Sequence, residues 1–406
     1  MKVNAVDIDL PQLHQADLQD QRVLCRVDFN VPLIGREVAD DSRIRAALPT
    51  ISTILEQHPR ALVLLSHLGR PKGKRSEDLS LAPIAPLLSK WINQEVHFSE
   101  DCIGTEVEQA IDQSPHGSVW LLENTRFHEG ETQNDAPFAA QLARLGDVFV
   151  NDAFGTCHRA HASNVGLSNL LPAYVGQLVT KEVFYLSSAL CHPQRPYLAI
   201  LGGAKISDKI TILERLLDRA DRVLIGGGMA NTFLAAQGQD LGDSLVEPAA
   251  FPLARKLLAK AAGRMWLPLD ATIAPPDGIT ADIQHVSVAE PLPAGWRIMD
   301  IGPATVQRFT AELEGAQTII WNGPLGVTEN PQFAIGSYAL AQAIAAQTSK
   351  GATTIIGGGD SAATIQAAGY AEQVSHLSTG GGASLALLAG DALPALSALT
   401  KEVTPS

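Results

Sequence analysis

Short apolar stretches alternate with amphipathic stretches along most of the chain, and polar residues directly follow many of the apolar ones. In the first half, the apolar stretches have the length and composition of buried strands, and helical patterns such as 42–48 separate them. The predicted strands are 22–25, 62–65, 119–122 and 148–150. Strands that alternate with helices are typical of βαβ units, so we expect a parallel sheet covered by helices.

A second series of the same kind begins after residue 196. Its predicted strands are 197–201, 222–225, 265–268, 318–321 and 353–356. Between the two series, a helical pattern at 179–190 stops just before two prolines, which cannot continue a helix. We therefore predict an α/β protein with two doubly wound, Rossmann-like parallel-sheet domains, 1–178 and 197–390, joined by a hinge helix and linker at 179–196.

The polar residues after the first four strands are the most informative feature of the sequence. Residues 26–32 follow the first strand, and 66–71, 123–127 and 151–155 follow the others. The carboxyl ends of parallel strands meet at one edge of a sheet, and ligands bind at that edge in open α/β sheets. The sequence therefore predicts a binding site at one rim of the N-terminal domain.

The charge distribution indicates what this rim binds. The 406-residue chain has a net charge of −13, which disfavours nucleic acid and anionic membranes as partners. Basic residues nevertheless gather in the first 161 residues, so we expect a small anionic substrate, although solvated surface charge would give the same count. These residues are Arg26, Arg43, Arg45, His67, Arg70, Lys72, Lys74, Arg75, Arg126, His158, Arg159 and His161.

The cysteines and the N-terminal residues indicate the cellular compartment in which we expect the protein. Four cysteines with irregular spacing and no C-x-x-C pair fit a reducing environment and give no zinc site. The first seven residues lack the apolar run of a signal peptide, and no stretch is long and apolar enough to span a bilayer. We therefore expect a cytoplasmic protein.

Three glycine triplets, 226–228, 357–359 and 380–382, precede small or helix-forming residues in the second half. Glycine lets the backbone approach a ligand closely, and a helix N-terminus offers N–H groups to phosphate, although glycine also serves plain tight turns. We predict phosphate binding in the C-terminal domain. The sequence has no G-x-x-x-x-G-K-[ST] loop, which excludes a P-loop enzyme, and no G-x-G-x-x-G after the first strand.

The segment 202–209 contains two lysines that suit a polyphosphate. If a helix begins near residue 204, Lys205 and Lys209 stand at i and i+4 on one face, where they bind phosphate or merely form a solvated surface. Asp360 opens the helix predicted after the second triplet. It is a candidate oxygen ligand for Mg²⁺, an N-cap, or both.

Together these segments resemble those of the phosphoglycerate kinase family over nearly the whole chain. The matching segments are 26–32, 66–71, 123–127, 151–161, 202–205, 226–230, 321–327, 357–361 and 379–384. That family reversibly transfers the acyl phosphoryl group of 1,3-bisphosphoglycerate to MgADP, giving 3-phosphoglycerate and MgATP. The resemblance implies a glycolytic kinase that uses Mg²⁺ and ADP or ATP, and transfers the group directly in line after domain closure. It also implies that the protein is a monomer.

The resemblance places phosphoglycerate on the N-terminal domain and nucleotide on the C-terminal domain, and implies that the tail, 391–406, packs on the N-terminal domain. The implied substrate-binding residues are Asp28, Phe29, Asn30, Arg43, His67, Leu68, Gly69, Arg70, Arg126 and Arg159. The implied nucleotide-binding residues are Lys209, Gly302, Glu329, Gly358, Gly359, Asp360 and Ser361, with Asp360 on the metal. The implied catalytic residues are Arg43, Lys205, Lys209, Gly380, Gly381 and Gly382.

The chain departs from the family pattern at two positions. Ser361 stands where some relatives carry Thr, and Thr328 precedes Glu329 where an aromatic residue is common. Neither change affects the transfer chemistry.

The phosphoryl acceptor is a carboxylate in one direction of the reaction and a nucleotide phosphate in the other, and both are already anionic. The reaction therefore depends on positioning and charge. We expect the histidines to donate hydrogen bonds or to support the structure.

Two rival classes stay open at this point. A two-lobed solute-binding protein also closes around an anion, but it requires an export signal and has no use for Lys205, Lys209 or Asp360. An NAD-dependent oxidoreductase is disfavoured by the missing glycine fingerprint. Thermal stabilisation by MgADP but not by NAD separates these classes from a kinase.

Overall fold

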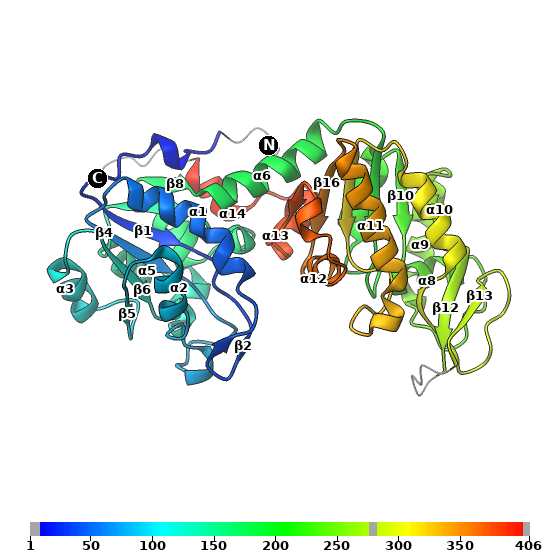
Figure 1. The fold of residues 1–406 in the computed structure, drawn as a ribbon, viewed down its shortest axis with the longest axis horizontal. Helices are drawn as coiled ribbons and strands as arrows, with labels where there is room; N and C mark the ends of the chain where they lie inside the picture. The colour runs from blue at the N-terminus through cyan, green and yellow to red at the C-terminus, as the bar shows by residue number, and fades with distance from the viewer. Residues whose placement is uncertain (1–8, 276–281, 401–406) are drawn as a thin grey trace. The chain divides into compact units, whose positions relative to one another are not determined.

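The computed structural model describes residues 9–275 and 282–400. The chain divides into two units, Met1–Phe184 with Asp391–Ser406, and Tyr185–Gly390 (Figure 1). The N-terminal residues on which the absence of a signal peptide was argued, and the end of the C-terminal tail, lie outside the described residues.

The first unit contains a six-stranded parallel sheet. Its strands run in the order β5 (Val96–Ser99), β6 (Ser118–Leu122), β4 (Ala61–Leu65), β1 (Arg22–Arg26), β7 (Val148–Asn151) and β8 (Ala173–Val175). The four predicted strands form its centre, with Cys25 paired to Leu64 on one side and Val150 on the other. The edge strands β5 and β8 were not predicted.

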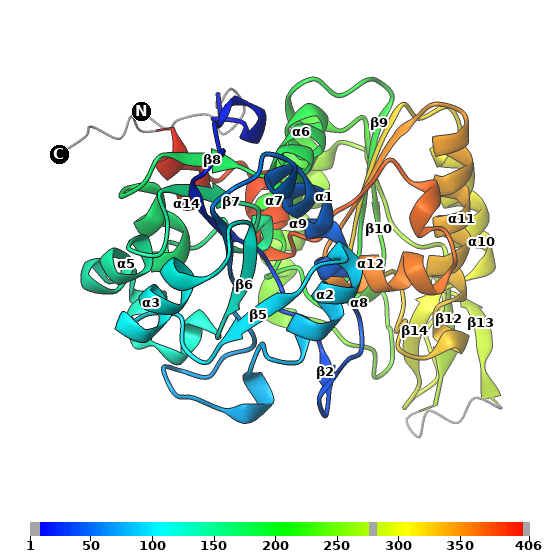
Figure 2. The ribbon, with the colours of Figure 1, turned by 60° about the vertical axis from the view of Figure 1, so that its left-hand side comes forward.

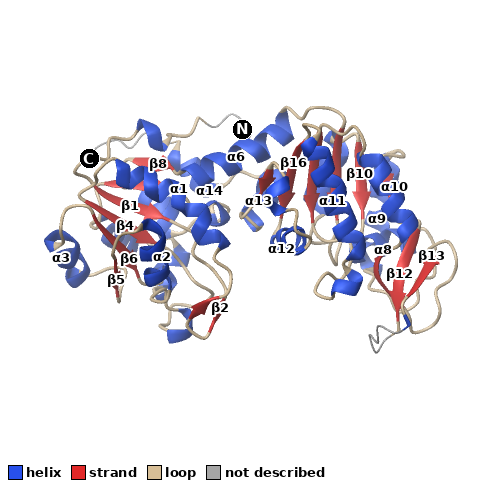
Figure 3. Cartoon of the chain, in the orientation of Figure 1, coloured by secondary structure: helices blue, strands red, loops and turns tan. Residues whose placement is uncertain are grey.

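Alternate residues of the central strands face two separate hydrophobic layers. Val23 and Cys25 pack with one pair of helices, α1 (Ser42–Glu56) and α2 (Ile84–Ile92). Leu24 packs with α3 (Thr105–Gln113) and α5 (Ala136–Ala143). The sheet is therefore covered by helices on both faces, as Figure 3 shows, and the doubly wound prediction is confirmed.

The second unit repeats this plan. Its parallel sheet has the order β11 (Met265–Trp266), β10 (Arg222–Ile225), β9 (Tyr197–Leu201), β15 (Thr318–Asn322), β16 (Thr353–Gly357) and β17 (His376–Leu377). The five predicted strands are confirmed here. The helices of this unit are α7 (Ile210–Arg219), α8 (Gly227–Ala236), α9 (Phe251–Ala261), α10 (Pro303–Leu313), α11 (Ile335–Ser349), α12 (Gly359–Ala367) and α13 (Gly382–Leu388).

A small antiparallel sheet in the second unit was not predicted. It consists of β13 (Gln284–Ser287), β12 (Asp270–Ala274) and β14 (Arg297–Ile301) (Figure 2). Its inner face, which includes Ala271 and Ile273, packs in a cluster with α8. A two-stranded ribbon of β2 (Leu33–Ile34) and β3 (Glu37–Val38) follows β1 in the first unit.

The helix between the two strand series is α6 (Gln177–Cys191), and the division into units falls within it. Its first turn is fixed in the first unit, because Gln177 N donates to Thr50 Oγ1 at 2.8 Å and Leu178 N donates to Asp152 Oδ1 at 2.9 Å. Near the C-terminus, α14 (Pro394–Leu399) contacts β8. Within the described residues, no helix has the length and apolar character needed to cross a membrane.

Candidate functional site

The polar segments after β1, β4 and β6 are joined to one another at the carboxyl edge of the first sheet. Phe29 N donates to Ser66 Oγ at 2.9 Å, and Thr125 N donates to Ser66 O at 3.1 Å. Gly69 N donates to Asn30 Oδ1 at 2.9 Å. Three predicted segments therefore form one hydrogen-bonded rim, as parallel strand ends require.

Asp28 lies at the centre of this rim and is almost fully buried. It accepts a hydrogen bond from Arg43, which α1 provides, and its Oδ1 lies 3.9 Å from Nδ1 of His67. Burial is the main cause that lowers the pKa of His67 well below its usual range, and the charges of Arg26 and Arg126 add to it. His67 is therefore a neutral hydrogen-bonding group at pH 7.

Arg26 is a buried cation that the predicted site omitted. Its Nη2 lies 3.1 Å from His67 Nδ1, and its Nε donates to Ser163 Oγ at 2.8 Å. Ser163 in turn donates to both carboxylate oxygens of Glu131, at 2.6 Å and 2.9 Å. Arg26 thus supports the rim from beneath. Its charge was visible in the sequence, but its partners His67 and Ser163 lie 41 and 137 residues away, and no local pattern indicates them.

Three of the predicted arginines line one cavity of about 240 Å³, together with Lys72. They are Arg70, Arg126 and Arg159. Arg126 Nη1 donates to Gly69 O at 2.7 Å, but its Nε and Nη2 are buried and have no hydrogen-bond partner among the described residues. Buried donors are normally paired, so these two atoms mark a place where an acceptor from outside the chain fits.

The electrostatics of the cavity favour an anion. Burial, followed by the neighbouring charges of Arg26 and Arg159, lowers the pKa of Arg126 to about 10. Burial and the charges of Arg126 and Arg26 lower the pKa of His161 to about 3. The cations raise one another's energy, and an oxyanion placed among them would relieve that repulsion.

Two of the predicted substrate residues can offer a ligand only their backbone groups. Phe29 and Leu68 are buried in the hydrophobic core between the sheet and α1, so their side chains cannot contact a ligand. Gly69 has φ +61°, and a Cβ there would lie 2.6 Å from Leu79 Cδ2. Glycine is required at this turn because a side chain would be both strained and crowded.

In the second unit, each glycine triplet opens a helix, as predicted. The N-cap residues are Gly226 for α8, Gly358 for α12 and Gly381 for α13. Gly358 and Gly381 have φ of +94° and +49°, which glycine adopts more readily than other residues. Some N–H groups at these helix starts are already paired within the chain, because Gly227 N donates to Leu325 O at 3.0 Å and Met229 N donates to Gly203 O at 3.0 Å. Gly380 N, just before α13, donates to Ser378 Oγ at 3.2 Å.

Lys209 is enclosed by backbone between β9 and β15. Its Nζ lies 2.8 Å from Gly202 O, 3.0 Å from Asn322 O and 2.6 Å from Asn322 Oδ1. Burial lowers the pKa of Lys209 to about 8, although the charges of Asp360 and Asp208 oppose the shift. Asn322 is a site residue that the sequence analysis did not single out.

The predicted pairing of Lys205 and Lys209 on one helical face is wrong. Helix α7 begins at Ile210, and Lys209 is only its N-cap. The carboxylate of Glu247 accepts hydrogen bonds from the N–H groups of Ile206 and Ser207, at 2.6 Å and 3.2 Å, and so holds the preceding residues in a turn. Lys205 is exposed in this turn, whereas Lys209 is partly buried.

Asp360 lies in the first turn of α12 and is exposed, but it is not the N-cap, which is Gly358. The next residue, Ser361, is buried, and its Oγ accepts a hydrogen bond from Gly323 N at 2.5 Å. Glu329 is exposed in the loop after β15. The hydroxyl of Ser361 therefore joins α12 to the β15 loop, and Asp360 stays available to solvent.

Gly302 has a packing role in this structure. It is the N-cap of α10, and a Cβ there would lie 2.3 Å from Cγ of Asp270. The Asp270 carboxylate accepts from Ala304 N and Thr305 N, so it caps the helix in place of a side chain at Gly302.

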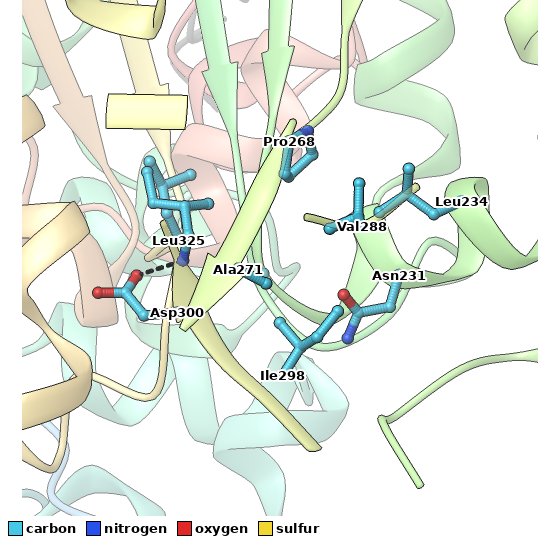
Figure 4. A pocket seen from close by; sticks show the side chains of 10 residues that line it. Asn231, Leu234, Pro268, Ala271, Val288, Ile298, Asp300 and Leu325 are labelled. Atoms are coloured by element: carbon cyan, nitrogen blue, oxygen red, sulfur yellow. Dashed lines mark hydrogen bonds between the residues drawn. The ribbon is translucent and has the colours of Figure 1, made fainter. Parts of the chain in front are cut away.

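A small cavity of about 10 Å³ lies beside Gly227 and is lined mainly by apolar side chains, including Ala271 and Leu325. In Figure 4 the carboxylate of Asp300 points away from these apolar groups. Burial raises the pKa of Asp300 to about 7, and hydrogen bonds from the N–H groups of Ile301 and Gly336 moderate the shift. The cavity next to the glycines that open α8 is thus lined mainly by apolar groups.

Known proteins resemble this chain over nearly its whole length. The family model described as phosphoglycerate kinase matches residues 13–391. A phosphoglycerate kinase from Chloroflexus aurantiacus is 52% identical over 395 residues, which are 95% of this chain and 98% of that protein. One from Moorella thermoacetica is 50% identical over 394 residues, 96% and 99% of the two chains. The solved structure of phosphoglycerate kinase from Coxiella burnetii has a TM-score of 0.86 at 40% identity and covers 97% of this chain and 100% of that chain.

Proposed function

The chain belongs to the phosphoglycerate kinase family, and from that premise we propose how its residues carry out the reaction. It is a nucleotide-using kinase of glycolysis that acts on small molecules and transfers a phosphoryl group to or from a carboxyl group. In the glycolytic direction the acyl phosphate of 1,3-bisphosphoglycerate gives its phosphoryl group to ADP, and 3-phosphoglycerate and ATP form.

The phosphoglycerate binds at the rim of the first unit. Arg70, Arg126 and Arg159 hold its phosphate, because guanidinium groups bind oxyanions in a bidentate way. Asp28 and Asn30 meet the triose, with His67 as a neutral hydrogen-bonding group beside them. Backbone groups at Phe29, Leu68 and Gly69 complete the site.

The observation that carries this assignment is the pair of buried, unpartnered nitrogens of Arg126 in a cavity lined by two further arginines. Titration calorimetry with 3-phosphoglycerate tests it. Arg126→Gln should weaken binding by roughly a hundredfold, in line with the loss of two charge-assisted hydrogen bonds. Arg144→Gln is the matched control, because Arg144 is an exposed arginine of the same unit that pairs with Glu108. Equal affinity of the two variants would refute the assignment.

The nucleotide binds in the second unit. Lys209 contacts its phosphates after exchanging part of its backbone contacts for phosphate oxygens, and the backbone from Gly358 to Ser361 lies along them. Glu329 accepts hydrogen bonds from the ribose hydroxyls, and Gly302 borders the nucleotide pocket. This proposal is supported by the three glycine-opened helices and by the partly buried lysine between the β9 and β15 loops.

Mg²⁺ accompanies the nucleotide, and Asp360 is the residue that would hold it. The fit is good, since Mg²⁺ takes hard oxygen ligands from one or two carboxylates plus substrate phosphates, and Asp360 presents an exposed carboxylate in the first turn of α12. When bound, Mg²⁺ neutralises charge on the phosphate oxygens. The chain's own part is to orient that carboxylate.

Transfer of the phosphoryl group requires positive charge on both sides of it. Arg43 and Lys205 flank it, and the N–H groups of Gly381 and Gly382 donate to its oxygens. The N–H group of Gly380 joins them after it gives up its hydrogen bond to Ser378 Oγ. The transition state spreads charge over three oxygens, so fixed donors stabilise it more than they stabilise the substrates. No general base is needed because the acceptor is already an anion.

The two substrates bind to different units, so we propose that the units close to bring donor and acceptor into line and to exclude water. The connector at 179–196 acts as the hinge, and the division of the chain within α6 supports that choice. Solution scattering with 3-phosphoglycerate and MgADP together should show a smaller radius of gyration than either substrate alone. An unchanged radius would contradict closure.

We propose that the enzyme acts as a cytoplasmic monomer. The irregular spacing of the four cysteines and the lack of a C-x-x-C pair support a reducing compartment. Light scattering coupled to gel filtration should give one chain mass, and a doubled mass would contradict the monomer.

A further inference from the structure

Three side chains with metal-ligating atoms meet in the first unit, outside the site described above. They are Asp101, Cys102 and His128, and one ligand atom from each lies within 4.8 Å of the others. We propose that this Asp–Cys–His cluster is a binding site for a single Zn²⁺ ion, distinct from the Mg²⁺ that accompanies the nucleotide. The inference does not depend on the proposed catalytic roles.

The cluster joins two segments of the chain. Asp101 and Cys102 lie in the loop between β5 and α3, whereas His128 is the N-cap of α4 (Glu129–Gln133). Nε2 of His128 lies 2.7 Å from Oδ1 of Asp101. This is a hydrogen-bond distance, and two ligand atoms that each lie about 2 Å from a tetrahedral zinc ion are about 3.3 Å apart. The carboxylate and the imidazole therefore need to separate by only about 0.6 Å to admit the ion.

Each ligand is held in place by its surroundings. Cys102 N donates to Asp101 Oδ1 at 2.6 Å, which fixes the carboxylate. The His128 ring stacks on Phe138 with 5.1 Å between the ring centres, and its backbone N donates to Thr125 O at 3.2 Å. A site with ligands fixed in this way loses little entropy when the metal binds.

The chemistry of the set selects the metal. Thiolate and imidazole suit zinc, whereas Mg²⁺ and Ca²⁺ prefer oxygen ligands alone. Three protein ligands leave one position for water, and the site can accept it because Asp101 and His128 are partly exposed while Cys102 is buried. The three ligand atoms lie within 4.8 Å of one another. Movements of about 1 Å would bring them to the spacing that a tetrahedral zinc site requires.

The electrostatic environment favours a cation. The carboxylates of Asp101, Glu131 and Glu123 lie close enough to the Cys102 thiol to interact with it electrostatically. Zinc binding forms a Zn–S bond and releases the thiol proton to solvent, while His128 coordinates as the neutral imidazole through Nε2. The surrounding negative charge would then lie beside a metal cation.

Occupancy would tie the loop at 100–104 to the segment that provides Arg126, two residues before His128. Metal binding should therefore stabilise the first unit, because a ligand that binds only the folded state raises its melting temperature. A few degrees of stabilisation by equimolar Zn²⁺ is expected for the full chain, and none for variants that lack a ligand.

The test uses the full chain, stripped of metal and without nucleotide, so that phosphates bind no metal. Titration with Co²⁺ should give a thiolate-to-metal charge-transfer band and the visible bands of a four-coordinate ion at one equivalent. Competition with a chromophoric chelator gives the Zn²⁺ affinity. His128→Gln and Cys102→Ser should each weaken binding by roughly a hundredfold or more, beyond what loss of an outer hydrogen bond causes. They should also abolish the stabilisation.

Two variants serve as matched controls. His116→Gln breaks an exposed pair in the same unit, in which His116 Nε2 lies 2.6 Å from Asp20 Oδ1. Cys191→Ser removes a partly exposed cysteine. Both should bind Zn²⁺ as the parent does. His128 is partly exposed, so His128→Gln remains a usable test if Cys102→Ser unfolds. The proposal is overturned if the parent shows no charge-transfer band, or if His128→Gln binds Zn²⁺ with the parent's affinity.

Discussion

The pKa of Lys209 makes the pH dependence of nucleotide binding a sharp test of the second site. Burial lowers this pKa from 10.5 to about 8. If only the protonated lysine binds phosphate, the competent fraction is about nine in ten at pH 7 and about one in eleven at pH 9. MgADP affinity should therefore fall roughly tenfold between these pH values, whereas an unperturbed lysine would leave it almost unchanged.

The direction of this pH dependence follows from the linkage between phosphate binding and protonation of Lys209. Bound phosphate raises the pKa of Lys209, so binding above pH 8 takes up a proton and becomes weaker as protons become scarce. Titration calorimetry measures this uptake directly when it is repeated in buffers of different ionisation enthalpy. Proton uptake should approach one per site near pH 9.

Lys209→Arg is the matched control, because arginine keeps its charge throughout this range. Its MgADP affinity should be nearly flat from pH 7 to pH 9, even if it is lower overall. Titration of Asp300, whose pKa is about 7, is common to both proteins and cancels in the comparison. Equal pH profiles for the parent and Lys209→Arg would refute both the lowered pKa and the phosphate contact.

Four further predictions test other parts of the structure. Arg43→Ala should lower turnover by roughly a hundredfold with smaller effects on KM, whereas Arg45→Ala on the same helix should not; parent-like turnover of Arg43→Ala would remove its catalytic role. Gly302→Ala should destabilise the protein by about 1–3 kcal/mol in urea unfolding, because its Cβ would meet the Asp270 carboxylate at 2.3 Å, and unchanged stability would contradict that packing. Burial raises the pKa of Asp152 to about 7 from 3.8, so its contribution to stability is full below pH 4 and is lost as the pH rises through 7. The parent should therefore lose on the order of 2 kcal/mol relative to Asp152→Asn between pH 5 and pH 8, and parallel profiles would disprove the shift. MgADP should raise the melting temperature and NAD should not; the reverse would favour a dehydrogenase.

The strand positions and the rim of the first unit followed from local pattern alone. Residues 23–25 of the first predicted strand are apolar and buried, and such a run forms a central parallel strand wherever helices flank it. The polar residues after it had to lie at the carboxyl edge, which is why Asp28, His67 and Arg126 were found together. The edge strand β8 escaped prediction because it has only three residues, and β13 of the small sheet because most of its residues are exposed.

The start of α7 shows where local pattern fails. The residues after Gly203 have acceptable helix propensity, yet Glu247 accepts their backbone N–H groups and keeps them in a turn. That carboxylate lies about forty residues away, so the competition between helix and turn is decided by a tertiary contact.

The sequence by itself determined the two parallel sheets, the basic rim and the glycine-opened helices, because each depends on residues that are neighbours along the chain. Only the tertiary structure decided the support of Arg26 by Ser163, the lowered pKa of Lys209 and the meeting of Cys102 with His128. Burial and pairing between distant segments set charge states and ligand distances, and no spacing in the chain encodes them.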